Sequence, residues 1–151
     1  MHDENRKSEL IKLYCETDYQ VFITDTPITV RIDKAIPYEL NKLIEQNHNK
    51  TGVILTAYNP RSEFYQESEN KRRNNKLKAV LIEQNFDLYL AKGQGNQTNW
   101  PAEESFFILN MSADQAEHHA VNFGQYAYVV LESSKTTSLV FSEIWNQARF
   151  S

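Results

Sequence analysis

Apolar residues along this chain follow two different periods, and the period changes from one segment to the next. Residues 28–32 alternate apolar and polar side chains, which is the pattern of a strand with one buried face. Residues 77–81 place Leu and Val at helical spacing instead. Residues 53–55 form a continuous apolar run, typical of a strand covered on both faces. We expect this last strand to be central in the fold.

The same patterns, followed along the whole chain, predict strand pairs that alternate with single helices. Helices are expected over residues 8–16, from 37 to before 52, from about 62–64 to 81, and over 112–123. Strands are expected over 19–24, 28–32, 53–58, 86–91, 105–111, 126–131 and 138–141. This order predicts an α+β (or α/β) fold, with a mixed sheet of about six to seven strands and about three to four packed helices.

A polar corner should follow the central strand. Asn59 precedes Pro60, so steric clash favours extended geometry at Asn59, and Pro60 has no N–H with which to continue a ladder. On the next helix, the apolar stripe becomes polar towards the N-terminus, where free N–H groups favour anions. The residues expected to converge there form the candidate site: Asn59, Arg61, Ser62, Asn70, Arg73 and Asn74. In the alternative interpretation, the asparagines cap turns and hold a loop, and the arginines are solvated charges.

Composition narrows the function classes. A chain of 151 residues that is 40% hydrophobic has the size of one globular domain, which we expect to span 1–151 with both termini frayed. The formal net charge is −4, and the basic run at residues 71–73 lies among glutamates, so duplex nucleic acid is a disfavoured partner. Cys15 is the sole cysteine, which excludes an internal disulfide and a cysteine-based zinc site.

Targeting and cofactor signals are missing from the sequence. The first ten residues are charged where a signal peptide would be apolar, and no apolar run approaches ~20 residues, so we expect a soluble cytoplasmic protein without a membrane partner. Thr98 stands where a dinucleotide-binding GxGxxG motif would need its third glycine. His118 and His119 lack an evident third ligand, so we expect surface histidines and no metal. No cofactor is expected.

Several stretches together resemble a family of small, mostly bacterial proteins, domain of unknown function 3293. An AxNP corner with a following Ser matches residues 57–62, and an NxxxN helix signature matches Asn70 and Asn74 before Leu77. A Trp, a Glu and an SF-type strand match the segment from Trp100 to Phe106, and FGQxA matches residues 123–127. The resemblance covers about residues 50–131, and it implies no activity.

The resemblance adds polar residues that packing alone would not require. They are Asn59, Ser62, Asn70, Asn74, Glu103 and Gln125. The segment between Trp100 and the strand is one residue longer than in the family pattern, so Glu103 and Glu104 compete for the glutamate position. Either would be the candidate general acid or base, since strand alternation turns only one of them inward. Arg73 or Arg61 would be its electrostatic partner, and Trp100 could stack on a ligand.

Two functions follow as hypotheses. The first is a site for a small polar or anionic ligand, of nucleotide or sugar-phosphate type, at the corner after the central strand. The second is a non-catalytic interaction protein whose exposed aromatic residues, Trp100, Tyr65 and Trp145, contact a protein or a single-stranded nucleic acid. The sequence leaves open whether a reaction follows binding and which oligomeric state the chain adopts.

Overall fold

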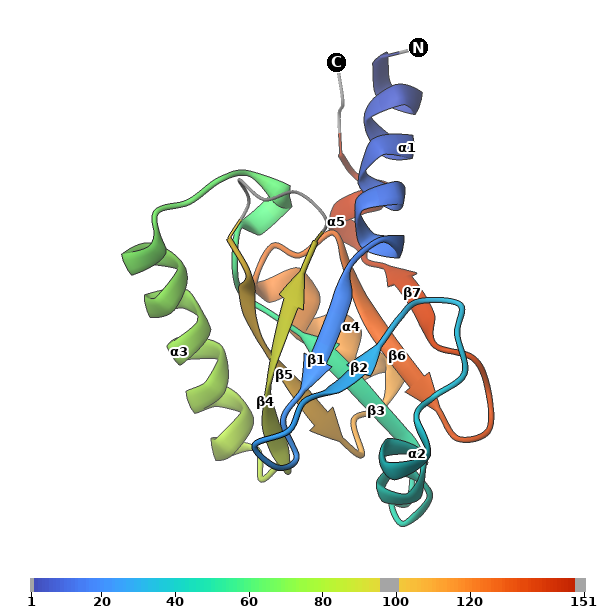
Figure 1. Ribbon diagram of the computed structural model, residues 1–151. Coiled ribbons are helices and arrows are strands. Elements are labelled where there is room, and N and C mark those ends of the chain that lie inside the picture. The colour runs from blue at the N-terminus through green and yellow to red at the C-terminus, as the bar shows by residue number, and fades with distance from the viewer. Residues whose placement is uncertain (1, 96–100, 149–151) are drawn as a thin grey trace.

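The computed structural model describes residues 2–95 and 101–148, which form an α+β fold around one sheet (Figure 1). The strands are β1 (Asp18–Val21), β2 (Ile28–Val30), β3 (Thr51–Leu55), β4 (Leu88–Gln94), β5 (Glu103–Leu109), β6 (Ala127–Glu132) and β7 (Ser138–Phe141). The helices are α1 (His2–Cys15), α2 (Tyr38–Glu45), α3 (Glu67–Glu83), α4 (Ala113–Asn122) and α5 (Glu143–Asn146), with a 3₁₀ turn η1 (Pro60–Ser62).

The seven strands are hydrogen-bonded in the order β2-β1-β4-β5-β3-β6-β7, and every pair is antiparallel. The expected mixed sheet is therefore wrong in its pairing, although the α+β class is confirmed. The reason lies in the crossovers. α3 links β3 to β4, which run in the same direction, but β5 lies between them; α4 links β5 to β6, and β3 lies between those. These two helical crossovers thus each skip one antiparallel strand, and the crossover through α2, from β2 to β3, skips three.

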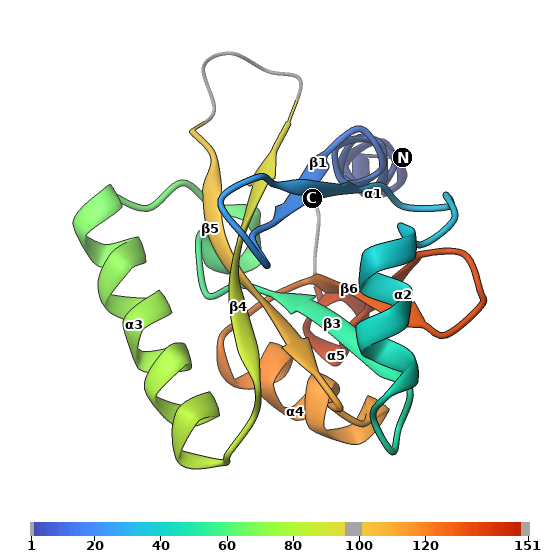
Figure 2. The same ribbon diagram turned by 60° about the horizontal axis from the view of Figure 1, so that its bottom comes forward.

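Strand β3 is central, as its apolar run predicts. It pairs with β5 through Leu55↔Phe106 and with β6 through Val53↔Val130. Its side chains alternate between two cores. Ile54 belongs to an inner core with α2, and Val53 and Leu55 belong to an outer core with α3 and α4. Figure 2 shows α2 and α3 on opposite sides of the sheet.

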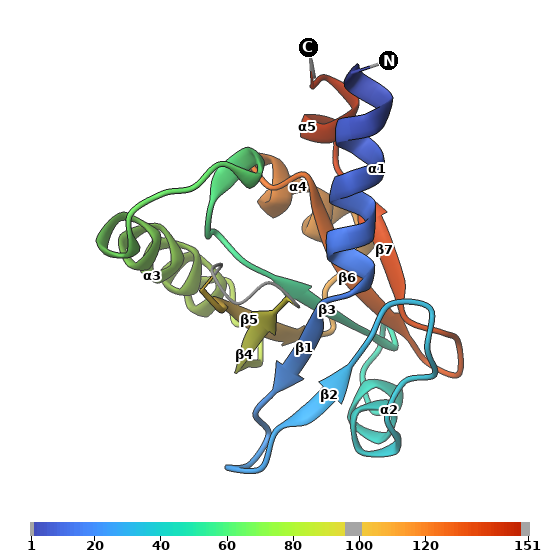
Figure 3. The same ribbon diagram turned by 45° about the horizontal axis from the view of Figure 1, so that its top comes forward.

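The sheet curls so that its two edges come together: the segment after edge strand β2 contacts the segment before edge strand β7. Ala35, after β2, bridges to Thr136, before β7. The Asp33 N–H donates to the Thr137 carbonyl and the Thr137 N–H donates to the Lys34 carbonyl, both over 2.8 Å. Beside this bridge, α2 covers the inner face of the sheet, and the inner core lies between them. At the other end of the inner face, α1 packs beside α5 (Figure 3). A cavity lies beneath α1.

Some element boundaries differ from the expected ones for local reasons. The helix expected from about 62–64 begins at Glu67, because Asn59, Arg61 and Ser62 have positive φ angles of 45°, 57° and 56° and form the η1 turn. The capping box at Ser112 and Gln115 is present as expected. Within residues 2–95 and 101–148, no helix combines the length and the apolar content that crossing a membrane would require.

Candidate functional site

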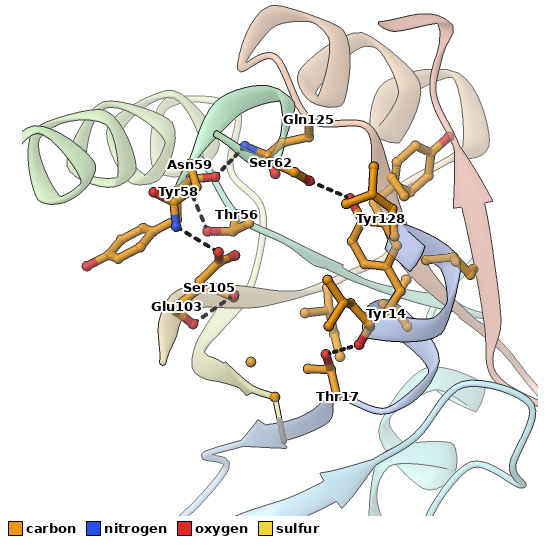
Figure 4. A pocket seen from close by; sticks show the side chains of 18 of the residues that line it. Tyr14, Thr17, Thr56, Tyr58, Asn59, Ser62, Glu103, Ser105, Gln125 and Tyr128 are labelled. Atoms are coloured by element: carbon orange, nitrogen blue, oxygen red, sulfur yellow. Dashed lines mark hydrogen bonds between the residues drawn. The ribbon is translucent and has the colours of Figure 1, made fainter. Parts of the chain in front are cut away.

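A cavity of about 350 Å³ lies beneath α1, at the end of the inner face that α2 does not cover (Figure 4). Its apolar wall comes from α1 and from the strands β1, β3, β6 and β7: Leu10, Leu13, Tyr19, Ile54, Ala127, Val129 and Leu139. Its polar wall gathers around the corner after β3 and the start of β5: Thr56, Asn59, Ser62, Glu103, Ser105 and Gln125. The cavity is therefore apolar along most of its length and polar at one end.

Asn59 organises the polar end. Its backbone N–H donates to Asn70 Oδ1 (2.8 Å), and its own Oδ1 accepts from the Tyr65 N–H (2.9 Å) and from Asn70 Nδ2 (2.9 Å). The remaining group, Nδ2, donates to Glu103 Oε2 over 2.8 Å. Figure 4 shows Asn59 and Glu103 facing each other at this side of the cavity. The left-handed backbone of Asn59 is therefore fixed by four hydrogen bonds, one of which orients the glutamate.

Asn70 and Asn74 bond mainly to the main chain around this corner. Asn70 Nδ2 also donates to the Tyr65 carbonyl (3.2 Å), and Asn74 Oδ1 accepts from the Ala57 N–H (3.0 Å). Both side chains are buried and neither lines the cavity. This arrangement fits the alternative interpretation, in which these asparagines hold a loop.

The two candidate arginines lie away from the cavity. The Arg73 guanidinium donates to the carbonyl oxygens of Ala57 (3.4 Å) and Phe123 (3.2 Å), and it lies 5.9 Å from the ring centre of Tyr65. The Arg61 side chain is exposed, and only its backbone N–H is tied down, to the Gly124 carbonyl (2.8 Å). Neither arginine lines the cavity that Glu103 enters. The structure thus brings together neither of the glutamate–arginine pairs expected from the sequence.

The alternation of β5 separates the two candidate glutamates. Glu103 lines the cavity, whereas Glu104 is exposed on the other face, 4.0 Å from Lys71 Nζ. Gln125 also lines the cavity, and its Nε2 donates to the Tyr58 carbonyl over 2.9 Å. Trp100 lies outside the described residues.

Sequence reasoning missed the wall that α1 supplies. The Tyr14 hydroxyl lies 3.4 Å from Ser62 Oγ, across the cavity from Glu103. Burial raises the pKa of Tyr14 to about 12; the Ser62 hydrogen bond opposes this shift and the negative charge of Glu103 adds to it. Burial, with a smaller contribution from the charges of Tyr14 and Glu103, also raises the pKa of Tyr19. Both tyrosines therefore stay neutral hydrogen-bonding groups at neutral pH.

Two other sequence expectations change. His119, expected at the surface, is buried between α4 and α3, with Nε2 2.9 Å from Gln84 Oε1. Trp145 is buried as well, since it packs against Tyr126 and Phe141 with ring centres 5.5 and 4.6 Å away. No group of three or more potential metal-ligating side chains occurs in the part of the chain that the structure describes.

One segment of the chain matches a known protein family. Residues 55–128 match a family described as protein of unknown function (DUF3293). This segment is similar to that family and covers just under half of the chain. The match confirms the resemblance expected from the sequence, and the family's description assigns no activity. No curated protein and no solved structure matches the chain.

The DUF3293 segment contributes the whole polar end of the cavity: Thr56, Asn59, Ser62, Glu103, Ser105 and Gln125 all lie within it. Tyr14 and the apolar cover from α1 lie outside it, as do Val129 and Leu139. The cavity is thus assembled from the family segment and from the chain on either side of it.

Proposed function

We propose that this protein binds a small molecule with an apolar body and a neutral or positively charged polar head in the cavity beneath α1. The observation that carries the proposal is the carboxylate of Glu103, which Asn59 holds at the polar end of a mostly apolar cavity. Mostly apolar pockets with a few convergent polar groups are the usual form of small-molecule sites.

The charges around the cavity favour a head that donates hydrogen bonds. Glu103 is the one charged side chain in the polar wall, and a carboxylate accepts hydrogen bonds but donates none. Arg6 and Glu9, which line the cavity from α1, lie 4.0 Å apart and offset each other's charge. A hydroxyl or ammonium group suits this wall better than the phosphate expected from the sequence, because Arg73 and Arg61 lie elsewhere.

The apolar wall supports a ligand body rather than a bare polar head. Leu10, Ile54 and Val129 are buried side chains that face the same space, and Leu13 closes it from the outer part of α1. Covering such surface with a ligand is favourable at about 25 cal/mol per Å² of apolar area. The hydroxyls of Tyr14 and Ser62 add donors and acceptors where the body meets the head.

The interaction-protein alternative has less support. Trp145 is buried in the α1–α5 contact and offers no exposed ring, and Tyr65 is half-buried beside Arg73. Of the three aromatic residues on which that hypothesis depended, Trp145 is therefore buried and Tyr65 exposes only part of its side chain; the third, Trp100, lies outside the described residues.

Three probes with one ring and different heads test the proposal: phenethylamine, phenethyl alcohol and phenylacetate. Their dissociation constants would be measured by calorimetry for the native chain, Glu103→Gln and Glu104→Gln. We expect phenethylamine to bind most tightly and phenylacetate most weakly. Glu103→Gln should cost phenethylamine at least about tenfold in affinity, since a hydrogen bond to a charged group contributes roughly 1.5–3 kcal/mol.

Glu104→Gln is the matched control, because it makes the same chemical change one residue along β5 on the opposite face. If neither phenethylamine nor phenethyl alcohol binds, or if the two variants weaken phenethylamine equally, the proposed site is wrong.

A further inference from the structure

A second hollow, of about 310 Å³, lies between α3 and α4 on the outer side of the fold, away from Glu103. We call it the basic hollow; its charged and imidazole groups are Arg72, Arg73, Lys76, His118 and His119, and Gln84 lies beside them. No carboxylate lines the basic hollow among the described residues. The basic hollow is therefore positively charged, although the chain as a whole has a net charge of −4.

Arg72 and Arg73 share one acidic neighbour, Glu69, whose pKa is lowered mainly by its hydrogen bond to Arg72 and also by the charges of both arginines. Arg73 donates only to neutral carbonyl oxygens, those of Ala57 and Phe123, which fix the guanidinium without neutralising it. For Lys76, the described part of the chain provides no hydrogen bond or ion pair. Arg72 differs, since it forms a two-point pair with Glu69 (2.7 and 3.0 Å).

The helix places these charges against one another. Arg72 and Arg73 lie four and three residues before Lys76, so all three share one face of α3, where like charges at these spacings destabilise a helix. An anion between them would remove that repulsion. The Arg73 bond to the Phe123 carbonyl also covers an acceptor beyond the C-terminal end of α4 that would otherwise repel an anion.

The α4 side of the basic hollow adds hydrogen-bonding groups. His119 is 2% exposed, and its Nδ1 has no hydrogen-bond partner among the described residues, although buried polar atoms are nearly always paired. Burial, and then the neighbouring charge of His118, lowers the pKa of His119, so the ring is neutral at pH 7. His118 and Asn122 lie at the rim, joined by a 3.1 Å contact between Nε2 and Nδ2.

We propose that the basic hollow is a second binding site, which takes a phosphate group, either free or as a monoester. Lys76 and Arg73 provide the charge. Because His119 Nε2–H donates to Gln84 Oε1, Nδ1 of the neutral ring is an acceptor, which suits the hydroxyl of a protonated phosphate. Lysine is well suited to bind phosphate as a point charge, and arginine presents a planar fork of N–H groups. The site is independent of the cavity beneath α1 and does not rest on its proposed function.

The test compares Lys76→Gln with Lys78→Gln in titrations followed by amide NMR signals. Lys78 is exposed on the same helix and does not line the basic hollow, so the two variants change the net charge equally. The probes are inorganic phosphate and glycerol phosphate, with sodium chloride at matched ionic strength. We expect saturable shifts at residues 72–76 and 118–123, and an affinity about tenfold lower in Lys76→Gln only.

Shifts that do not saturate, that chloride reproduces, or that both variants weaken equally would overturn the proposal. Tighter binding of glycerol phosphate than of inorganic phosphate would indicate a phosphorylated small molecule as the source of the group, and the reverse order would indicate free phosphate. Glu103→Gln should leave these titrations unchanged, so the proposal for the basic hollow and the proposal for the cavity beneath α1 can be refuted independently. Urea unfolding of both lysine variants checks that their folds are intact.

Discussion

Replacing Asn70 with leucine is expected to destabilise the fold strongly. The change removes the acceptor of the Asn59 N–H (2.8 Å) and the donor to the Tyr65 carbonyl (3.2 Å) and to Asn59 Oδ1 (2.9 Å). Leaving a buried polar group unsatisfied costs about 1–3 kcal/mol. Two backbone groups lose the partner that Asn70 provides, so we expect a loss of about 3 kcal/mol. For a chain of this length, that lowers Tm by about 6–12 °C.

Urea unfolding followed by far-UV circular dichroism measures this loss, and Asn75→Leu is its control. Asn75 is exposed on the neighbouring position of the same helix, so the identical substitution there should change stability by less than about 0.5 kcal/mol. Equal unfolding midpoints for the two variants would refute the reasoning, because they would mean that the Asn70 amide does not hold the corner. A ligand-binding role alone would leave the midpoint of Asn70→Leu near that of the native chain.

Two further predictions concern stability. Gly124→Ala should cost about 1–2 kcal/mol, because Gly124 has a φ of +69° and an added Cβ would lie 3.0 Å from Pro60 Cβ; a thermal melt with the Tm of the native chain would contradict this. Tyr14, whose pKa is raised to about 12 by burial, keeps its proton in the folded chain while the unfolded chain loses it above about pH 10. Its contribution to stability is therefore full below pH 10 and falls as the pH rises towards 12, so urea midpoints should fall less steeply over this range in Tyr14→Phe than in the native chain.

The central strand β3 is predictable from sequence because its signal is local. The apolar run of β3 indicates its burial on both faces. The extended geometry expected at Asn59 is wrong, since β3 already ends at Leu55 and Asn59 is left-handed with a φ of 45°. The partners of the corner are not local. Whether Asn70 faces a ligand or the backbone of Asn59 depends on the path of the loop through three left-handed residues, which no helical periodicity encodes.

The remaining surprises also come from tertiary placement. Every strand pair is antiparallel because other strands lie between the two strands that each helix connects. This depends on the order of the strands in the sheet, which no single segment of the sequence encodes. Tyr14 carries no sequence signal that distinguishes a cavity-lining hydroxyl from a packed ring. His119 occupies a buried position on α4 between the small residues Ala116 and Ala120, and Gln84, which bonds its ring, comes from a different helix.

Two residues of helix α1 can test whether this helix forms a wall of the binding site or only stabilises the fold. Leu13 and Ile11 lie on the same helix and are almost equally exposed, at 39% and 40%. Of the two, Leu13 lines the cavity and Ile11 does not. Leu13→Ala should weaken the binding of phenethyl alcohol about fivefold, because a half-covered leucine contributes roughly 1 kcal/mol of apolar burial. Ile11→Ala should leave that affinity unchanged, as measured by calorimetry. Equal losses in both variants would mean that α1 acts through its stability rather than as a wall of the site, and the apolar body of the proposed ligand would then have to lie elsewhere.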